Sequence, residues 1–221
     1  MSIKDEYKVI PIPSGQTHDW LLNKHYAKRI PSISYAFGLY DSNNDLQGIC
    51  TFGRTAFYEP SLICGEENKN IVYELNRLCV NDGQPPNALS YFVSSCIKLL
   101  PCPSILISYS DEAQGHLGHI YQATNWLYTG YGVGSINYIT SIGRLSRSGM
   151  RNRETRKQEI PEIFSIESGS IKHRYVYFWG NKTQINAMKC KLKYPTLPYP
   201  KGDNKRYDAS YQPEIQQVLF V

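Results

Sequence analysis

The segment from Ser108 to Tyr128, SYSDEAQGHLGHIYQATNWLY, carries more polar and aromatic side chains than packing requires. Asp111 follows a short apolar run, so its carboxylate would emerge at the carboxyl edge of a sheet, where open α/β sheets bind ligands. Tyr121, Asn125 and Tyr128 are spaced by four and three residues, which would place them on one helix face. Such a cleft would suit proton transfer. The alternative is structural, with Asp111 as a helix cap and the aromatic rings in the core.

Arg77 is a charged residue in the run VYELNRLCV, residues 72–80, which otherwise has the alternation of a buried strand. A buried guanidinium is rarely unpaired, so it should meet a carboxylate or an anionic ligand. Asp111, at a neighbouring strand end, is the expected partner. His25 is ambiguous, because it would either pack in a helix running from about His18 to Lys28 or reach the same cleft.

The strand at 72–80, the loop NDGQPPN and the following helix would place backbone N–H groups at the positive end of that helix. Such a position holds a pyrophosphate or another anion. The motifs G-x-x-x-x-G-K-[ST] and G-x-G-x-x-G are both absent. Asn87 or Ser90 would alternatively only cap the helix. The residues of this candidate cofactor site are Leu78, Val80, Gly83, Asn87 and Ser90.

Positive charge is concentrated in the segment from Arg144 to Lys157, RLSRSGMRNRETRK, which has six basic residues and one Glu. Residues 1–143 carry a net charge of −3, whereas residues 144–221 carry +8. With Leu145 and Met150 as its only large apolar residues, the segment should form an exposed loop or arm. Such an arm is typical of proteins that bind phosphates, although a solvated loop without a partner has the same composition. The residues expected to contact a nucleic acid or another anionic ligand are Arg144, Arg147, Arg151, Arg153, Arg156 and Lys157.

Periodicity predicts the elements that must position these residues. Strands are expected at 35–40, 46–53, 72–80, 104–109, 136–142 and 174–179, and helices at 88–100 and from about 116 to 128. This order predicts a mixed α/β sheet flanked by helices. The tail, rich in Pro and Tyr, should be an irregular extension that packs along the body through Tyr199, Tyr207 and Tyr211.

A chain of 221 residues fits one domain with a sizeable extension. We expect a catalytic core over residues 1–143, with a basic arm, a late strand and the tail packed on it over residues 144–221. No run of about 18 apolar residues occurs, so no membrane span is expected. The N-terminus MSIKDEYKVI lacks the apolar stretch of a signal peptide, and the cytoplasm is the expected compartment.

Three stretches of unusual composition together resemble a known family: YELNRLCVNDGQPPNALSYFVSSCIKLL, ILISYSDEAQGHLGHIYQATNWLYTG, and HRYVYFWG with LKYPTLPYPKG. They are similar to the phage Mom DNA-modification proteins, over about Trp20 to Gly202. The resemblance implies a GNAT-like mixed central sheet, with an acyl-CoA pyrophosphate site at residues 72–100. It places Arg77, Ser90, Asp111 and Tyr121 in the active site. Instead of the usual GNAT loop, (Gln/Arg)-x-x-Gly-x-(Gly/Ala), this chain has DGQPPNA from residue 82.

The activity implied by the resemblance is conversion of adenine in double-stranded phage DNA to N6-(carbamoylmethyl)adenine, which protects the DNA from restriction in the host cytoplasm. Plain acyl transfer to N6 would give an amide, whereas the product carries a CH2 group on N6, so the site would have to do more than one acylation or alkylate the nitrogen. The donor would be an acyl-CoA or a glycine-derived molecule. A redox metal such as iron would be held by His25, Asp111 and His116. The base must leave the stack, and Tyr121, Trp126 and Tyr128 would offer it aromatic faces.

Two other functions remain open at this point. One is a GNAT-type, acyl-CoA-dependent N-acetyltransferase that acts on a small amine or a protein. The other is a DNA-binding module without catalysis, which would explain the basic arm but not the polar cluster between Ser108 and Tyr128.

Overall fold

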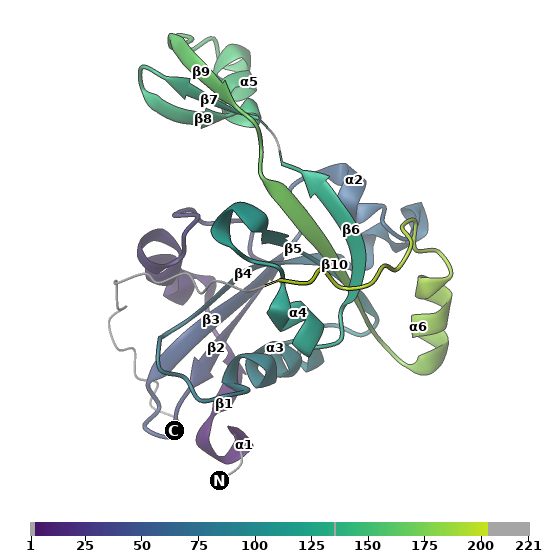
Figure 1. Ribbon diagram of the computed structural model, residues 1–221. Helices are drawn as coiled ribbons and strands as arrows, with labels where there is room; N and C mark the ends of the chain where they lie inside the picture. Colours follow the sequence, from purple (N-terminus) through teal and green to yellow (C-terminus); the bar gives the residue numbers. More distant parts are fainter. Residues whose placement is uncertain (1–2, 135, 203–221) are drawn as a thin grey trace.

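Seven strands form a mixed sheet in the order β1-β2-β3-β4-β5-β10-β6 in the computed structural model, which describes residues 3–134 and 136–202 (Figure 1). Neighbouring strands are antiparallel, except that β4 and β5 are parallel. The predicted mixed α/β class is thus confirmed. The strands are β1 (Lys8–Pro11), β2 (Tyr35–Tyr40), β3 (Leu46–Gly53), β4 (Val72–Val80), β5 (Ser104–Asp111), β6 (Leu127–Val133) and β10 (Ile171–Trp179).

The main helix of the core, α3 (Ala88–Lys98), forms the crossover from β4 to β5, as the apolar spacing of residues 88–100 predicts. Most other helical segments of the core are a single turn or little more. They are α1 (Ile3–Glu6), η1 (Ser14–Thr17), η2 (Trp20–Lys24), α2 (Tyr58–Ser61), η3 (Glu66–Ile71), η4 (Glu112–Gln114), α4 (His119–Ala123) and α6 (Lys182–Lys189).

Both faces of the central strand β5 are covered, which explains its nearly continuous apolar sequence. Leu106 packs on one face with Phe92 of α3, whereas Ile105 and Ile107 pack on the other face with Met188 of α6. Successive residues of a strand point to opposite faces, so an alternating pattern appears only where one face is solvated. The sheet is therefore the middle layer of the core.

The N-terminal helical segment ends earlier than the sequence indicates. Trp20 and Leu21 of η2 are fully buried against β2 and β3, so this segment closes one end of the sheet. A helix from His18 to Lys28 is wrong, because His25 has extended backbone angles of −71° and 134° and ends the helix. The chain therefore turns at His25, which is itself buried.

The predicted helix from 116 to 128 is also wrong. Only α4 is helical, and it ends where the Thr124 hydroxyl donates to the Ile120 carbonyl at 2.7 Å and Asn125 adopts a left-handed φ of 61°. The chain then enters β6, where Tyr128 pairs with Tyr175 of β10. Tyr121, Asn125 and Tyr128 therefore do not share a helix face.

The basic segment belongs to a small lobe, which we define as residues 137–167, and not to a loop or an extended arm. The lobe has a three-stranded sheet in the order β8-β7-β9 and one helix. It projects from the end of β6 and β10 in Figure 1, and the two connecting chains touch where the Gly134 N–H donates to the Ser170 carbonyl at 2.8 Å. Its elements are β7 (Asn137–Thr140), β8 (Gly143–Ser146), α5 (Arg147–Thr155) and β9 (Ile163–Glu167).

The described part of the tail packs along the body, as its tyrosines predict. The Tyr199 hydroxyl donates to the Trp126 carbonyl at 2.7 Å, and Leu197 bridges to Tyr128. Tyr207 and Tyr211 lie outside the described residues. Among residues 3–134 and 136–202, no helix has the length and hydropathy needed to cross a membrane.

Candidate active site

A cavity of about 880 Å³ opens where the two parallel strands of the sheet separate. β4 and β5 pair only between Val72–Glu74 and Ile105–Ile107, after which β4 follows β3 and β5 follows β10. The Ser108 hydroxyl, 2.8 Å from the Leu75 carbonyl, joins the strands at this fork. A ligand in this cavity would therefore contact backbone and side chains from the middle of the sheet.

The cavity brings together both groups of residues that the sequence singles out. Its size is within the range typical of small-molecule sites. Residues expected to act on the base and residues expected to hold the donor both line it. The predicted residues that line it are Arg77, Tyr121, His25 and His116 together with Leu78, Val80, Asn87 and Ser90.

Arg77 and Ser110 present unsatisfied polar atoms in this wall. In the described part of the chain, Arg77 Nε and Ser110 Oγ are buried without a hydrogen-bond partner. Arg77 uses Nη1 to donate to the Asn76 carbonyl at 2.5 Å. Burial, and then the neighbouring Arg29, lower the pKa of Arg77. Buried polar groups are normally paired, so this wall is suited to a ligand that accepts hydrogen bonds.

Glu74 is a cavity residue that the sequence analysis missed. It is half-buried, and burial raises the pKa of its carboxyl group, opposed by Arg77 and by the Ala56 N–H. A carboxylate with a raised pKa is suited to accept a proton near neutral pH. The sequence does contain a signal for Glu74, because this charged residue lies in the same mostly apolar strand as Arg77.

Tyr26 lies between two histidines, and it too was missed. Its ring stacks on His25 at 4.5 Å between centroids and meets the edge of His116 at 6.0 Å. Burial, followed by Arg77, lowers the pKa of His25 to about 3, so the ring is neutral at physiological pH. His25 Nδ1 accepts from the Ala27 N–H at 3.1 Å, which leaves the proton on Nε2. The group is thus an uncharged aromatic wall.

Tyr121 is held in place by a buried hydrogen bond. Its hydroxyl oxygen lies 2.7 Å from Ser108 Oγ, which also lies 2.8 Å from the Leu75 carbonyl oxygen. Because that carbonyl can only accept, the Ser108 proton points to it and the Tyr121 hydroxyl donates to Ser108. Burial raises the pKa of Tyr121, so the phenol stays neutral. Its ring packs on Trp126 and Tyr175 and is 8% exposed, so Tyr121 lines the cavity only with the edge of a core side chain.

The expected ion pair between Arg77 and Asp111 is wrong, because the strands that carry them have separated. Asp111 is buried at 7% exposure and pairs with Lys172 of β10. It also accepts from the Ala113 N–H at 3.1 Å, as the cap of η4. Burial raises the pKa of Asp111, but the hydrogen bonds from Lys172, Ser170 and Ala113 and the charge of Lys172 together lower it by more, so the net shift is a decrease. Asp111 does not line the cavity. Burial lowers the pKa of the cavity residue His116, and the charge of Asp111 opposes this shift only in part.

Four other predicted residues lie away from the cavity. Asn125 is exposed in the turn after α4, and Gly83 lies in the loop after β4 with a left-handed φ of 77°. Tyr128 is a core residue whose hydroxyl lies 2.9 Å from His173 Nδ1. Trp126 is fully buried, so it offers no face to a base.

The predicted metal ligands do not form a metal site. His25 Nδ1 is occupied by a backbone N–H, and the Asp111 carboxylate is occupied by Lys172 and Ala113. Within residues 3–134 and 136–202, no group of three His, Cys, Asp or Glu side chains could hold a metal ion. The donor atoms of His25, Asp111 and His116 therefore do not fit an iron centre.

The start of α3 lines the cavity. Asn87 precedes the helix in a left-handed conformation with φ 70°, and its side chain makes no capping bond. Ser90 donates to the Asn87 carbonyl at 3.0 Å, so neither residue caps the helix in the usual way. The positive end of the helix dipole suits an anionic group of a donor, whereas the carboxylate of Asp82 in the same wall opposes it.

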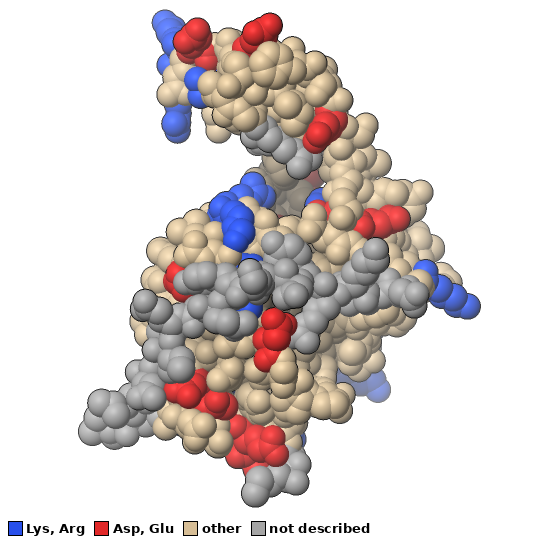
Figure 2. Space-filling model, turned by 60° about the vertical axis from the view of Figure 1, so that its left-hand side comes forward, with Lys and Arg blue, Asp and Glu red and all other residues tan. Residues whose placement is uncertain are grey.

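The basic residues of the lobe are mostly exposed. Arg153 is the exception, because its Nε donates to the Glu159 carbonyl at 3.0 Å, and for Arg144 the structure describes the backbone, in β8. Figure 2 shows basic side chains on the lobe and on the core, on either side of the recess that separates them. The exposed basic residues are Arg147, Arg151, Arg156 and Lys157.

Solved structures similar to the chain include two acetyltransferases. An N-acetyltransferase from Staphylococcus aureus Mu50 matches with a TM-score of 0.44 and 11% identity, over 78% of this chain and 98% of that one. A spermidine N-acetyltransferase from Vibrio cholerae, in complex with CoA and spermine, matches with a TM-score of 0.45 and 8% identity, over 82% of this chain and 99% of that one.

Sequence comparison gives a more specific result. A protein of Escherichia phage Mu, methylcarbamoylase mom, is 28% identical over 211 residues, which cover 89% of this chain and 84% of that protein. The family model described as the Mom protein family matches residues 6–201. These residues include both the strands that form the cavity and the lobe, so the chain belongs to the Mom protein family.

Proposed function

We propose that this protein is a phage DNA-modifying transferase that converts adenine in double-stranded DNA to N6-(carbamoylmethyl)adenine and so protects the DNA from restriction. Family membership supports the proposal, and so does the activity in the name of the phage Mu relative. The observation that carries it is that one cavity is lined by Arg77, Glu74 and Tyr121 as well as by the start of α3. One compartment thus offers room for a base and for part of a donor.

The reaction forms an N–C bond at the exocyclic nitrogen of adenine, a weak nucleophile whose lone pair is delocalised into the ring. As N6 bonds to the CH2 carbon of the donor, the bond from that carbon to a leaving group breaks, the leaving group departs with the bonding electrons, and a proton leaves N6. We assign this proton to Glu74, because its carboxyl group lines the cavity and has a raised pKa. The Tyr121 ring and the neutral rings of His25 and Tyr26 would form the aromatic surroundings of the base.

The donor in this proposal lies along Leu78, Val80, Asn87 and Ser90, and it is an acyl-CoA or a glycine-derived molecule. Asp111 acts as a positioning residue, because it fixes Lys172 in the cavity wall and influences the charge of His116. The compartment of action would be the host cytoplasm, where the DNA is exposed to restriction enzymes.

Expression of the protein in bacteria that carry a plasmid tests this function. The plasmid is digested to nucleosides, and mass spectrometry identifies any deoxyadenosine with a carbamoylmethyl group on N6. We expect the modified nucleoside with the wild type, none with an empty vector, and a loss of about 100-fold with Glu74→Gln, in line with the loss of a general base. Unmodified deoxyadenosine from cells that contain soluble, folded wild type would contradict the proposal.

A further inference from the structure

An aromatic side chain stands exposed at the mouth of the cavity. Phe57 is 59% exposed, yet it lines the cavity together with Ala56 and Pro60. Single exposed apolar residues are common on protein surfaces and need no function. Phe57 differs from them in its position, because it borders the cavity in which we place the modified base.

The segment that carries Phe57 is firmly attached to the core. The Arg54 guanidinium donates to the Asn70 carbonyl at 2.6 Å and lies 4.7 Å from the centre of the Tyr73 ring. The Thr55 hydroxyl donates to the Phe57 carbonyl at 2.8 Å, and the Ala56 N–H bonds to the carboxyl group of Glu74. These bonds hold the backbone, so the Phe57 side chain is presented outward by a fixed support.

The neighbouring aromatic residue behaves differently. Tyr58 is 57% exposed, but its hydroxyl donates to Glu66 at 2.7 Å and its ring lies 5.7 Å from the Lys69 ammonium. It does not line the cavity. Of these two adjacent rings with nearly equal exposure, Phe57 is the one directed to the cavity mouth.

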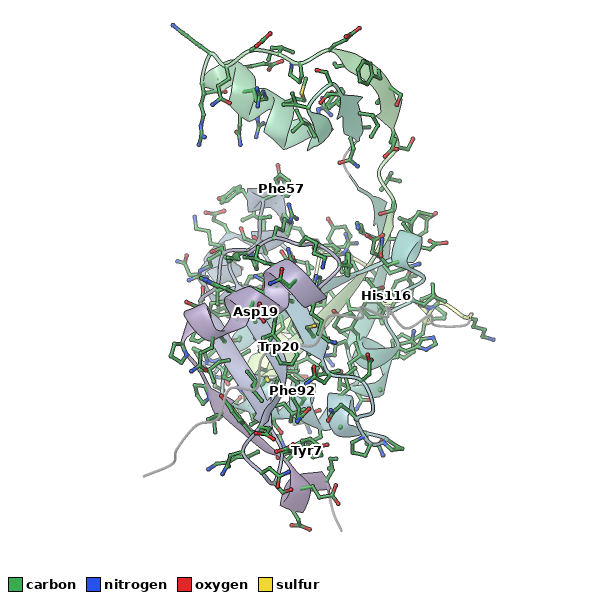
Figure 3. All side chains as sticks on the ribbon, turned by 90° about the vertical axis from the view of Figure 1, so that its left-hand side faces the viewer. Tyr7, Asp19, Trp20, Phe57, Phe92 and His116 are labelled. Carbon is green, nitrogen blue, oxygen red and sulfur yellow. The ribbon has the colours of Figure 1, made fainter. Side chains whose placement is uncertain are left out.

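Positive charge lies on both sides of Phe57. Arg29 lines the same cavity on the core, and Arg147 and Arg151 are exposed on the lobe. In Figure 3, nitrogen-tipped side chains of the lobe helix point toward the core, and Phe57 stands at the edge of the core that faces them. An apolar ring between two groups of cations is complementary to a base step between two phosphate strands.

We infer that Phe57 inserts into double-stranded DNA and occupies the space that the target adenine leaves when it turns into the cavity. The inference rests on the proposed function and adds the means of base extrusion. Apolar wedges unstack base steps in other DNA-bending proteins, and an aromatic ring stacks on any base. Phe57 would therefore compensate in part for the lost base stacking, and the effect would not depend on the sequence around the adenine.

Permanganate oxidation of thymine tests the inference, because a thymine that loses its partner adenine becomes reactive. The purified full chain is added to duplex DNA of mixed sequence, and reactive thymines are mapped. We expect the wild type to create reactive thymines and Phe57→Ala to reduce their yield about tenfold. Phe57→Trp should restore it, and Tyr58→Ala should behave as the wild type.

Two further measurements separate this inference from the proposed function. Affinity for the duplex should change less than twofold in Phe57→Ala, because the phosphate contacts remain. Carbamoylmethyl deoxyadenosine in plasmid DNA should fall with the thymine reactivity. Absence of this nucleoside with the wild type would contradict the proposed function itself. Its presence, with equal thymine reactivity in wild type and Phe57→Ala, would overturn the role of Phe57 alone.

Discussion

At the scale of single residues, burial changes the pKa values of the ionisable groups that line the cavity. Arg77 and Glu74 lie on the same strand three residues apart. Burial lowers the pKa of Arg77 and raises the pKa of Glu74. His25 is already neutral, because burial and Arg77 lower its pKa to about 3. The charged side chains that line the cavity are nevertheless mostly basic: Lys24, Arg29, Arg77, Lys172 and Arg174 against Glu74 and Asp82.

His25 gives this part of the molecule a predictable dependence on pH. In the unfolded chain the pKa of His25 is 6.5, whereas in the folded protein it is about 3. Between these pH values His25 is protonated in the unfolded state and neutral in the folded state. Above pH 6.5 His25 is neutral in both states and does not lower the free energy of unfolding. As the pH falls below 6.5, protonation of His25 in the unfolded state lowers that free energy. Between pH 6.5 and 5 the loss from His25 is about 2 kcal/mol.

Urea unfolding of wild type and His25→Gln at pH 7 and pH 5 measures this effect. The variant keeps a hydrogen-bond acceptor near the Ala27 N–H but does not titrate. We expect the free energy of unfolding of the wild type to fall by about 2 kcal/mol more than that of the variant. The same decrease in both proteins would show that His25 is not buried as a neutral ring.

At the scale of elements, the two chains that carry the lobe meet at a pair of glycines. A Cβ atom added to Gly169 would lie 1.9 Å from the Gly134 carbonyl oxygen, too close for any side chain. A Cβ atom added to Gly132 would meet nothing within 4 Å. Glycine at position 169 therefore allows the two chain segments that follow β6 and precede β10 to lie in contact where they lead to the lobe.

Gly169→Ala should displace the lobe and weaken binding to duplex DNA by about tenfold, while the core remains folded. Gly15→Ala, where an added Cβ atom likewise meets nothing within 4 Å and which does not line the cavity, should leave the affinity within twofold of the wild type. Fluorescence anisotropy with a labelled duplex gives the affinity, and thermal unfolding checks the core. Equal affinities of the two variants would mean that the position of the lobe does not matter for DNA binding.

The elements that the sequence predicts well are those with long, regular patterns. The helix at 88–100 and the strands at 35–40, 46–53 and 72–80 follow from their apolar spacing. The helix at 116–128 fails because Asn125 adopts a left-handed conformation and because the aromatic run after it pairs with β10. Pairing with a strand some 50 residues away along the chain leaves no local signal.

At the scale of the whole molecule, the site depends on a separation of strands that sequence spacing does not reveal. Arg77 and Asp111 lie near the ends of neighbouring strands, so a contact between them is a reasonable prediction. β4 and β5, however, pair over only three residues on each strand and then diverge. Lys172 becomes the partner of Asp111 only because β10, the last strand of the sheet along the chain, returns beside β5.

The lobe and the core together should bind DNA through phosphates. Replacement of Arg147, Arg151 and Arg156 by Ala should lower the slope of log affinity against log salt by about one unit for each lost phosphate contact. As a control of equal charge, Lys182, Lys189 and Lys193 are replaced by Ala near α6, which lies away from the lobe (Figure 1). The control variant should have the same slope as the wild type. An unchanged slope in both triple variants would show that the lobe does not contact the DNA phosphates.

Photo-crosslinking tests most directly the central claim that an adenine of duplex DNA enters the cavity, and it needs no donor. The full chain is irradiated with duplex DNA that contains 8-azidoadenine in place of adenine, and mass spectrometry maps the crosslinked peptides. The account predicts crosslinks to cavity residues such as Tyr26, Arg77 and Tyr121. It also predicts that Phe57→Ala reduces their yield. Crosslinks confined to the lobe, with none in residues 24–29, 74–80 or 109–121, would contradict it.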